Sequence, residues 1–570
     1  MNPTELRSAS RAPRLILEFV YEHEAQSPER LYLTQPIGGR EVVDYTWRQV
    51  VDQARRMAAH LKKRGFEPGA RIAILSGNCA HFIMAELAIW MAGATTVAIY
   101  PNEAPATIRH VLDHSGASLL FVGKLDQWDR QRTAVPASVP CIALPLAPPT
   151  PFATWDGIMR QTAPQAENTV RAPGDLALIS YTSGSTGQPK GVMHSFERIS
   201  DTSIRIVDHL RGIHGAGLES RTLSYLPLAH IYERAWLECA SLVDGRGQIY
   251  FTESLETFAQ DLVRARPNGF ISVPRLWLKF QQAVHARMPP EALDRLLQDP
   301  LTGPVVAREV LKGMGLDHVI TASSGSAPIP PELIHWYRRL GLNLMEGYGM
   351  TEDFAYSHAS RDGLHAPGCV GVPLPGVQVR IADDGEILVK SPGQLVGYYK
   401  RPDLDAEAFT RDGFFRTGDQ GERLPNGLLR ITGRLKEIFK TSKGKYVAPA
   451  PIENRLQAHP MVESAIVCGS GQAAPYAVVV LADDWRARVD TAPARAQVDK
   501  ALCDLLAQVN GSLADHEKLA MVVVSPEPWS IENGCLTPTF KIKRARIEAT
   551  LDPQAPLWYA ERRPVVWATP

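Results

Sequence analysis

The chain has few cysteines and no pattern among them. Its 570 residues include seven cysteines, which are scattered, odd in number and contain no CxxC pair. Such a set argues against a disulfide framework or a structural zinc site and predicts buried thiols in a reducing compartment. The stretch from Met1 to Arg14 carries arginines, but no apolar segment of signal-peptide length follows it. We therefore expect a cytoplasmic protein.

Long uncharged hydrophobic runs are absent as well. The most apolar window, 82–100, contains Glu86 and Gly93, whereas a membrane-spanning helix needs about 20 apolar residues. A buried helix over 82–91 followed by a strand over 94–100 fits this window better. The sequence thus predicts no transmembrane segment and leaves contact with a membrane surface open.

Neither sign of charge dominates, because 61 basic residues balance 61 acidic ones. A nucleic-acid-binding protein needs a net basic face, so we expect no nucleic-acid partner. The 45% hydrophobic and 21% charged fractions are ordinary for a globular protein. Chains longer than roughly 250–300 residues usually divide, so we expect at least two domains. The oligomeric state stays open.

Short apolar runs alternate with amphipathic stretches in the N-terminal part of the chain. Strand-like runs at 71–75, 95–100 and 119–122 are separated by helical stretches. This alternation predicts an α/β fold with a mostly parallel sheet and helices on both faces. The stretch 331–340 places five apolar residues on one helical stripe, which predicts core packing. The proline-rich stretch 136–151 predicts a surface connection.

The pattern changes beyond Asp383 to short strands and tight turns. Glu386–Lys390 reads as a strand, and Asn426-Gly427 between short apolar runs indicates a hairpin. A compact α+β stretch begins after Gly433, with strands expected at 464–467, 476–481 and 519–524 and a helix at 494–513. We place the boundary near Gly433–Lys436. This predicts a large domain of mixed α/β sheets over 1–433 and a small mobile domain over 434–570.

One loop has the composition of an anion-binding turn. Residues 181–191 read YTSGSTGQPKG and follow an apolar strand at 176–180. Small residues let a backbone bend around an anion, and exposed N–H groups and hydroxyls donate to phosphate oxygens. Lys190 adds a positive charge. The loop is not a Walker A sequence, which requires GxxxxGK[ST]. The predicted phosphate ligands are Thr182, Ser183, Gly184, Ser185, Thr186, Gly187 and Lys190.

This loop resembles the signature loop of the adenylate-forming superfamily, which includes acyl-CoA synthetases, luciferase-type enzymes and peptide-synthetase adenylation domains. The other family motifs follow in order across nearly the whole chain. LPLAHIYER at 226–234, VPRLW at 273–277 and LTPTFK at 536–541 resemble the long-chain acyl-CoA synthetase branch.

The resemblance implies a complete nucleotide site. SSGSAP at 323–328 is similar to the turn beside adenine, and EGYGMTE at 346–352 is similar to the segment whose tyrosine lies against the base. Glu352 and Thr182 would then hold Mg²⁺. Asp419 and Arg434 match the residues that contact the ribose. The remaining nucleotide-binding residues implied are Gly325, Ser326, Ala327, Glu346, Gly347, Tyr348, Gly349 and Thr351.

The resemblance also implies catalytic and mobile residues. Lys541 matches the catalytic lysine, with Lys543 as its rival, and Phe540 stands where the family commonly has glycine. Lys190 and His230 complete the catalytic set, His230 near the acid carboxylate. Lys436 matches the hinge of the small domain. Lys443, in place of a usual glycine, and Gly444 would lie near the CoA thiol.

The implied reaction is ATP-dependent activation of a carboxylic acid, expected to be a long-chain fatty acid, followed by thioester formation with CoA. Two alternatives keep the same site: a carrier-protein acceptor in place of CoA, and a medium-chain or aromatic acid. A non-catalytic nucleotide-binding or lipid-binding relative is disfavoured by the intact set of Thr182, Glu352, Asp419, Arg434 and Lys541.

Overall fold

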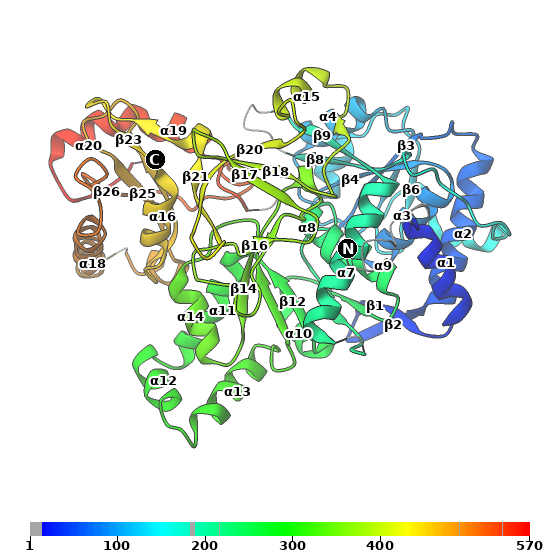
Figure 1. Cartoon of the computed structure of the whole chain (residues 1–570), viewed down its shortest axis with the longest axis horizontal. Coiled ribbons are helices and arrows are strands. Elements are labelled where there is room, and N and C mark those ends of the chain that lie inside the picture. Colours follow the sequence, from blue (N-terminus) through cyan, green and yellow to red (C-terminus); the bar gives the residue numbers. More distant parts are fainter. Residues whose placement is uncertain (1–13, 183–187, 216, 490, 538–539, 570) are drawn as a thin grey trace, which may run out of the picture.

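The fold is that of a computed structural model that describes residues 14–182, 188–215, 217–489, 491–537 and 540–569 (Figure 1). Strands and helices from the first three quarters of the chain form a broad body. The C-terminal elements, orange to red in Figure 1, gather at one end of it. The helices longer than one turn are α1 (Ile16–Gln26), α2 (Trp47–Lys63), α3 (Ala80–Met91), α4 (Pro105–Ser115), α6 (Trp155–Gln161), α7 (Phe196–His214), α9 (Ala240–Asp244), α10 (Phe258–Ala265), α11 (Pro274–Arg287), α12 (Pro290–Leu297), α13 (Gly303–Gly313), α14 (Pro331–Arg339), α15 (Pro402–Ala408), α16 (Pro449–Gln457), α18 (Ala492–Asn510), α19 (Arg544–Leu551) and α20 (Ala555–Glu561).

The largest sheet among the described residues has eight strands. Their order is β19 (Gly397–Tyr398), β9 (Lys190–Ser195), β8 (Leu176–Thr182), β4 (Thr95–Ile99), β3 (Arg71–Leu75), β5 (Leu119–Val122), β6 (Cys141–Ala143) and β7 (Ala153–Thr154). All pairings are parallel except β8 with β9 and β9 with β19. Alternate side chains of β3 enter separate cores on the two faces. The predicted parallel α/β sheet is confirmed.

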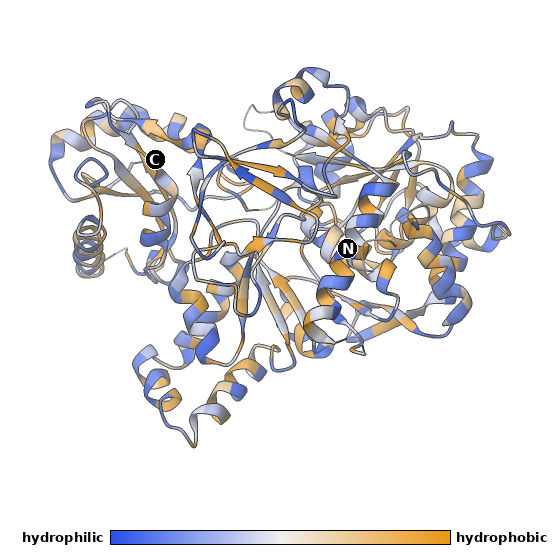
Figure 2. Ribbon diagram, in the orientation of Figure 1, coloured by the Kyte–Doolittle hydropathy of each residue, from blue (hydrophilic) through white to orange (hydrophobic). Residues whose placement is uncertain are grey.

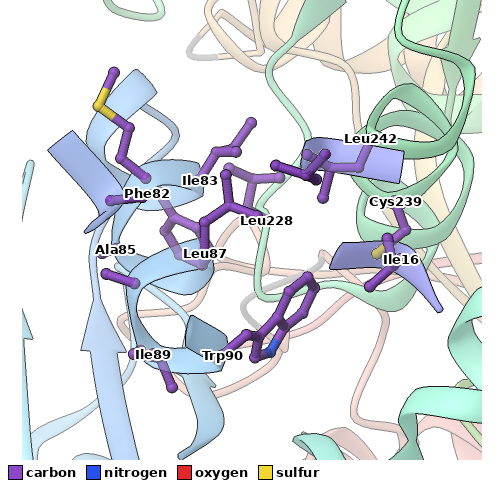
Figure 3. Packing of buried hydrophobic residues seen from close by; sticks show 14 of the residues in the cluster. Ile16, Phe82, Ile83, Ala85, Leu87, Ile89, Trp90, Leu228, Cys239 and Leu242 are labelled. Atoms are coloured by element: carbon purple, nitrogen blue, oxygen red, sulfur yellow. The ribbon is translucent and has the colours of Figure 1, made fainter. Parts of the chain in front are cut away.

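Helix α3 is buried on every side, as expected for a largely apolar sequence. Its residues are all buried, and Phe82, Ile83, Leu87 and Trp90 pack with Leu228 and neighbouring side chains (Figure 3). The window 82–100 is therefore a core helix followed by strand β4, as predicted. No helix within the described ranges combines the length and apolar character needed to cross a bilayer.

Two further sheets complete the central body. One has the order β10 (Arg221–Ser224), β11 (Gln248–Phe251), β1 (Leu31–Gly38) and β2 (Glu41–Thr46). The other has the order β12 (Gly269–Ser272), β13 (Thr321–Ser324), β14 (Leu344–Tyr348), β15 (His358–Ala359) and β16 (Val372–Pro373). The predicted apolar stripe of α14 packs against the second of these sheets in its own core, which confirms the expectation for 331–340.

A small antiparallel sheet follows, with the order β17 (Gln378–Ile381), β18 (Glu386–Lys390), β20 (Phe415–Arg423) and β21 (Leu429–Arg434). The predicted Asn426-Gly427 hairpin is the turn between β20 and β21. Gly427 has a φ of +85°, a conformation that favours glycine. This hairpin sets the register that places Asp419 opposite Arg434.

The C-terminal elements have their own cores, which begin at Phe439 and extend to Ala568. The strands form a hairpin, β22 (Phe439–Lys440) with β23 (Tyr446–Val447), and a sheet with the order β24 (Val462–Cys468), β25 (Tyr476–Leu481), β26 (Val522–Val524) and β27 (Val565–Trp567). The strand expected over 519–524 begins only at Val522, because the Asn510 side chain binds both backbone groups of Leu519.

Hydropathy follows this architecture. Figure 2 shows hydrophobic residues gathered on interior strands and on one side of many helices.

The stretch 136–151 is not purely a connection, because it contains β6, whose residues pair with β5. All seven cysteines are free thiols; four are buried, and Cys141, Cys503 and Cys535 are half-buried. The prediction of burial therefore holds for four of them.

Candidate active site

The predicted phosphate loop joins two neighbouring strands of the eight-stranded sheet. β8 ends at Thr182 and β9 begins at Lys190, and these residues are opposite one another in the antiparallel pair. The loop residues 183–187 lie outside the described residues. The Thr182 hydroxyl is buried and has no hydrogen-bond partner within the described parts of the chain. A buried hydroxyl without a partner is costly, so this oxygen is available to a ligand.

Lys190, Tyr398 and Glu352 form a chain of polar contacts beside this loop. Lys190 Nζ donates to the Tyr398 hydroxyl at 2.9 Å, and that hydroxyl donates to Glu352 Oε1 at 2.8 Å. Lys190 Nζ also lies 3.4 Å from Glu352 Oε1. Burial and the Glu352 carboxylate raise the pKa of Tyr398, so the hydroxyl keeps its proton. Sequence reasoning missed Tyr398, because it lies 208 positions from the lysine it binds.

These oxygens fit a magnesium ion. Mg²⁺ prefers oxygen ligands, commonly one or two carboxylates together with substrate phosphates. Glu352 offers a carboxylate whose side chain is 13% exposed, and Thr182 offers the hydroxyl without a partner. Lys190 beside them suits the phosphate oxygens that such an ion would accompany.

The turn after β13 and the strand β14 approach each other closely. A Cβ on Gly325 would touch the Tyr232 ring at 3.4 Å, and one on Gly349 would lie 2.7 Å from the Ala355 carbonyl carbon. The Tyr232 hydroxyl binds the Ser323 hydroxyl at 2.8 Å. Glycine is needed at 349 because a larger residue would collide with backbone. In the same turn, Ser326 has a φ of +70° and Ala327 is exposed.

The EGYGMTE segment divides its side chains between two directions. Glu346 is buried and accepts from the Gly368 N–H at 3.0 Å, and burial raises its pKa to about 8. That contact holds the loop around Gly368. Gly347 pairs with Ala359, and the Thr351 carbonyl accepts from His194 at 2.8 Å. Tyr348 instead extends toward the small antiparallel sheet.

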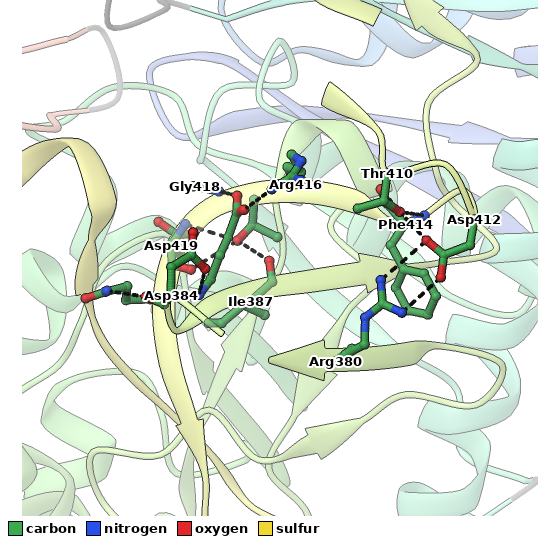
Figure 4. A network of polar contacts seen from close by, with 12 residues as sticks. Arg380, Asp384, Ile387, Thr410, Asp412, Phe414, Arg416, Gly418 and Asp419 are labelled. Carbon is green, nitrogen blue, oxygen red and sulfur yellow. Dashed lines mark hydrogen bonds and ion pairs between the residues drawn. The ribbon is translucent and has the colours of Figure 1, made fainter. Parts of the chain in front are cut away.

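Tyr348, Asp419 and Arg434 make a second polar cluster. The Tyr348 hydroxyl donates to Asp419 Oδ2 at 2.7 Å, and Arg434 Nε lies 2.9 Å from Asp419 Oδ1. Thr417 and Gly418 hold the bend that presents this carboxylate: Thr417 accepts from the Asp419 N–H, and Gly418 donates to Glu386 (Figure 4). A carboxylate can accept about four hydrogen bonds, so Asp419 retains capacity for two vicinal hydroxyls.

His230 is the N-cap of the short helix α8 (Ile231–Glu233). Its Nδ1 accepts from the Tyr232 N–H at 3.1 Å, which assigns the ring proton to Nε2. Burial, and then the charge of Lys541, lower the pKa of His230 to about 3. The imidazole is therefore neutral and presents an N–H donor.

Lys541 comes from the C-terminal elements and lies close enough to interact with residues of the central body. Burial of its ammonium, and then the Arg434 charge, lower the pKa of Lys541, while Asp419 and Glu352 oppose that shift. The rival Lys543 instead influences Glu103. Lys541 is thus the lysine that joins the predicted cluster. Phe540 before it has a φ of +59°, the backbone conformation that the commoner glycine would favour.

Three predicted residues lie on connecting segments. Lys436 is exposed within a short 3₁₀ helix, Leu435–Glu437. Lys443 and Gly444 form the exposed turn between β22 and β23. Gly444 has a φ of +77° there, and its N–H donates to the Thr441 carbonyl at 2.9 Å. Lys436 thus lies on a short connecting helix, and Lys443 and Gly444 lie on an exposed turn.

Comparison with known protein families identifies the constellation. Residues 20–399 match the AMP-binding enzyme family, and residues 436–560 match the AMP-binding enzyme C-terminal domain. The chain belongs to the AMP-binding enzyme family. The long-chain-fatty-acid–CoA ligase FadD15 of Mycobacterium bovis is 31% identical over 93% of this chain and 94% of its own. Human long-chain-fatty-acid–CoA ligase 1 is 27% identical over 88% of this chain and 81% of its own.

Solved structures share the fold of this AMP-binding enzyme. The adenylation domain of a carboxylate reductase from Mycobacterium chelonae superposes with a TM-score of 0.80 at 22% identity, covering 97% of this chain and 92% of that one. The anthranilate CoA ligase AuaEII, in complex with anthranoyl-AMP, gives a TM-score of 0.75 at 19% identity, covering 98% and 100%. At this identity the likeness concerns the fold, and it confirms the predicted fold class.

Proposed function

We propose that this enzyme activates a carboxylic acid with ATP, forming an acyl-adenylate and pyrophosphate, and then transfers the acyl group to CoA. One observation carries the proposal. A lysine from the C-terminal elements, Lys541, shares its electrostatic environment with the acids Asp419 and Glu352 and with His230 of the central body. Such an arrangement suits a reaction in which negative charge gathers at one phosphate.

The first step is an in-line attack of the acid oxygen on the α-phosphate of ATP. Its catalysis consists of positioning and charge stabilisation. Asp419 and Arg434 hold the ribose, Tyr348 and the 325–327 turn border the base, and Lys190 binds the departing phosphates. The neutral His230 donates to the acid carboxylate, and Lys541 offsets the charge on the α-phosphate. Glu352 and Thr182 would hold a magnesium ion, which would supply neutralisation of phosphate charge.

The second step needs a different arrangement of the domains. The thiol of CoA attacks the acyl carbon and AMP leaves. We propose two domains, 1–433 and 434–570, with a rotation at Lys436 that withdraws Lys541 and brings Lys443 and Gly444 toward the thiol. The separate cores beyond Phe439 support the two-domain division. A cytoplasmic location belongs to this proposal, in keeping with seven free thiols.

The acid is proposed to be a long-chain fatty acid. The names of the relatives in Mycobacterium bovis and in human support this choice.

The proposal is tested by acid-dependent exchange of labelled pyrophosphate into ATP, over acids of graded chain length and with benzoate. We expect exchange without CoA, strongest for long alkyl chains, and thioester formation once CoA is added. Strongest exchange with benzoate would replace the fatty-acid assignment by an aromatic acid. Transfer to a carrier protein but not to CoA would replace the acceptor. Absence of exchange with every acid would contradict acid activation itself.

Replacing Tyr398 with phenylalanine is expected to raise the Mg²⁺ concentration needed for half-maximal exchange by about 10–100-fold, the usual cost of losing a partner of a metal ligand. The variant loses the hydroxyl that orients Glu352. Magnesium titrations of exchange would measure the change. The control is Tyr399→Phe, because that hydroxyl makes only a 3.4 Å bond to the Ser115 carbonyl. An unchanged requirement in Tyr398→Phe would contradict this role.

Replacing Lys436 with proline is expected to slow thioester formation from supplied acyl-adenylate by at least about tenfold while exchange falls less. Proline fixes φ near −65° and removes the N–H, so the hinge loses part of its range. The two half-reactions are measured separately. Lys436→Ala removes the same side chain with the backbone free, and it should behave like the wild type. Equal slowing of both steps by proline would place the hinge elsewhere.

A further inference from the structure

An ion pair joins the central body to the C-terminal domain through two residues that have no role in the scheme above. Arg275, the second residue of α11, donates through Nη2 to Oε1 of Glu463 on β24. The Arg275 side chain is 34% exposed and that of Glu463 is 18% exposed. Figure 1 shows the C-terminal elements, with α16 among them, next to the part of the central body that contains α11 and α14. The ion pair therefore depends on the relative orientation of the two domains.

The same arginine touches the turn that carries Lys541. The Arg275 guanidinium lies 5.4 Å from the centroid of the Phe540 ring, within the range of a cation–π contact. Phe540 has a φ of +59°, which is unfavourable for a residue with a Cβ. The ring contact helps to offset that conformation. Phenylalanine, in place of the family's usual glycine, thus gives the turn that carries Lys541 a side chain that contacts Arg275.

Arg275 is held rigidly in the part of the central body that forms the proposed nucleotide site. Strand β12, which leads into α11, pairs with β13, and the Gly325 N–H donates to the Ser272 carbonyl at 3.1 Å. Trp277, two residues after Arg275, is fully buried in the core of that sheet. The arginine therefore moves with the turn that borders the base.

Glu463 has a second partner within its own domain. Arg486 Nη1 lies 3.0 Å from Glu463 Oε2. If the domain rotates away from Arg275, Arg486 still neutralises Glu463, so the carboxylate is not left unpaired. The ion pair can therefore form and break without leaving a charge unpaired. This suits a contact that is present during only one of the two half-reactions.

We propose that Arg275 is a positioning residue, which by pairing with Glu463 and contacting Phe540 holds Lys541 at the α-phosphate during acyl-adenylate formation. This inference rests on the proposed function. Arg275 touches no substrate in this scheme. It acts through the lysine turn in the first step, and it separates from Glu463 and Phe540 before the thiol reacts.

The test compares Arg275→Met with the control Arg339→Met, which breaks an exposed pair with Asp294, using the acid that best supports exchange in the wild type. Arg275→Met should lower pyrophosphate exchange by about tenfold, the effect expected for a close charge pair at a domain interface. Thioester formation from supplied acyl-adenylate should change by less than about twofold, and Arg339→Met should change either step by less than about twofold, as for an exposed pair.

Glu463→Gln removes the charge of the same ion pair from the side of the C-terminal domain. It keeps the proposal testable if Arg275→Met fails to fold. It should also lower exchange selectively, and combining the two variants should cost no more than Arg275→Met alone. Equal losses in both steps, fully additive losses, or unchanged exchange in Arg275→Met would each overturn the role of Arg275. Absence of exchange in the wild type would overturn the proposed function as well, and the wild-type measurement therefore separates the two failures.

Discussion

Lys541→Ala is expected to lower acid-dependent pyrophosphate exchange by about 10²–10³-fold, the usual cost of removing one group that stabilises transition-state charge. The C-terminal domain contributes this ammonium to a site already holding the carboxylates of Asp419 and Glu352. Without this ammonium, the negative charge on the α-phosphate during the attack would no longer be offset by the cation of the C-terminal domain. Exchange and single-turnover formation of acyl-adenylate measure the loss.

Thioester formation from supplied acyl-adenylate should remain within a few-fold of the wild type in the same variant, because in the proposed cycle this step breaks the acyl–phosphate bond after the lysine has withdrawn. The matched control is Lys543→Ala, two residues further along the chain, whose charge acts on Glu103. It should leave exchange within a few-fold. Equal losses in both half-reactions of Lys541→Ala, or a larger loss in Lys543→Ala, would remove Lys541 from its proposed role.

The parts of the fold that could be predicted are those encoded locally. Strands such as 71–75 and 119–122 were recognised because burial on both faces of a parallel sheet demands continuous apolar runs. The hairpin at Asn426-Gly427 was recognised because its turn requires a positive φ. Where a side chain interfered, prediction was less accurate: Asn510 binds the backbone of Leu519 and delays β26 to Val522.

The candidate site likewise combines residues that short motifs predict with residues that only the folded chain brings together. Asp419 and Arg434 lie in recognisable motifs, and the β20–β21 register brings them together. Tyr398 lies in none of these motifs, and the VPRLW motif that contains Arg275 does not reveal its partner, since the partners come from segments 208 and 188 positions away. Their importance depends on pairing between strands and on docking of domains, which no short motif records. The roles of the motif residues themselves stay predictions until the half-reactions are measured.

The second large effect concerns stability. Arg234, the last residue of LPLAHIYER, is fully buried, as are Glu86 and Glu238 beside it. Its Nη1 binds both oxygens of Glu86, while Nε and Nη2 donate to the Leu228 carbonyl at 3.2 and 3.0 Å. Burial, and then Glu86, raise the pKa of Glu238, so Glu238 carries a proton and Arg234 neutralises Glu86.

Arg234→Met is therefore expected to lower the free energy of unfolding by about 3–5 kcal/mol, because it leaves Glu86 as a buried charge without a partner. Chemical denaturation measures the change. The control is Arg109→Met, which breaks an exposed i,i+4 pair with Asp113 on α4 and should cost less than about 1 kcal/mol. A similar small cost in Arg234→Met would contradict the stabilising role of the buried pair of Arg234 and Glu86.

The double variant Arg234→Met, Glu86→Gln separates the charge from the hydrogen bonds. Removing the stranded carboxylate should restore most of the lost stability, since replacing both partners of a buried pair is far less costly than replacing one. Exchange activity should recover less, because the Leu228 carbonyl would still lack its two donors. That carbonyl lies two residues before His230, so the segment that presents the imidazole to the acid would stay poorly held even in a stable protein.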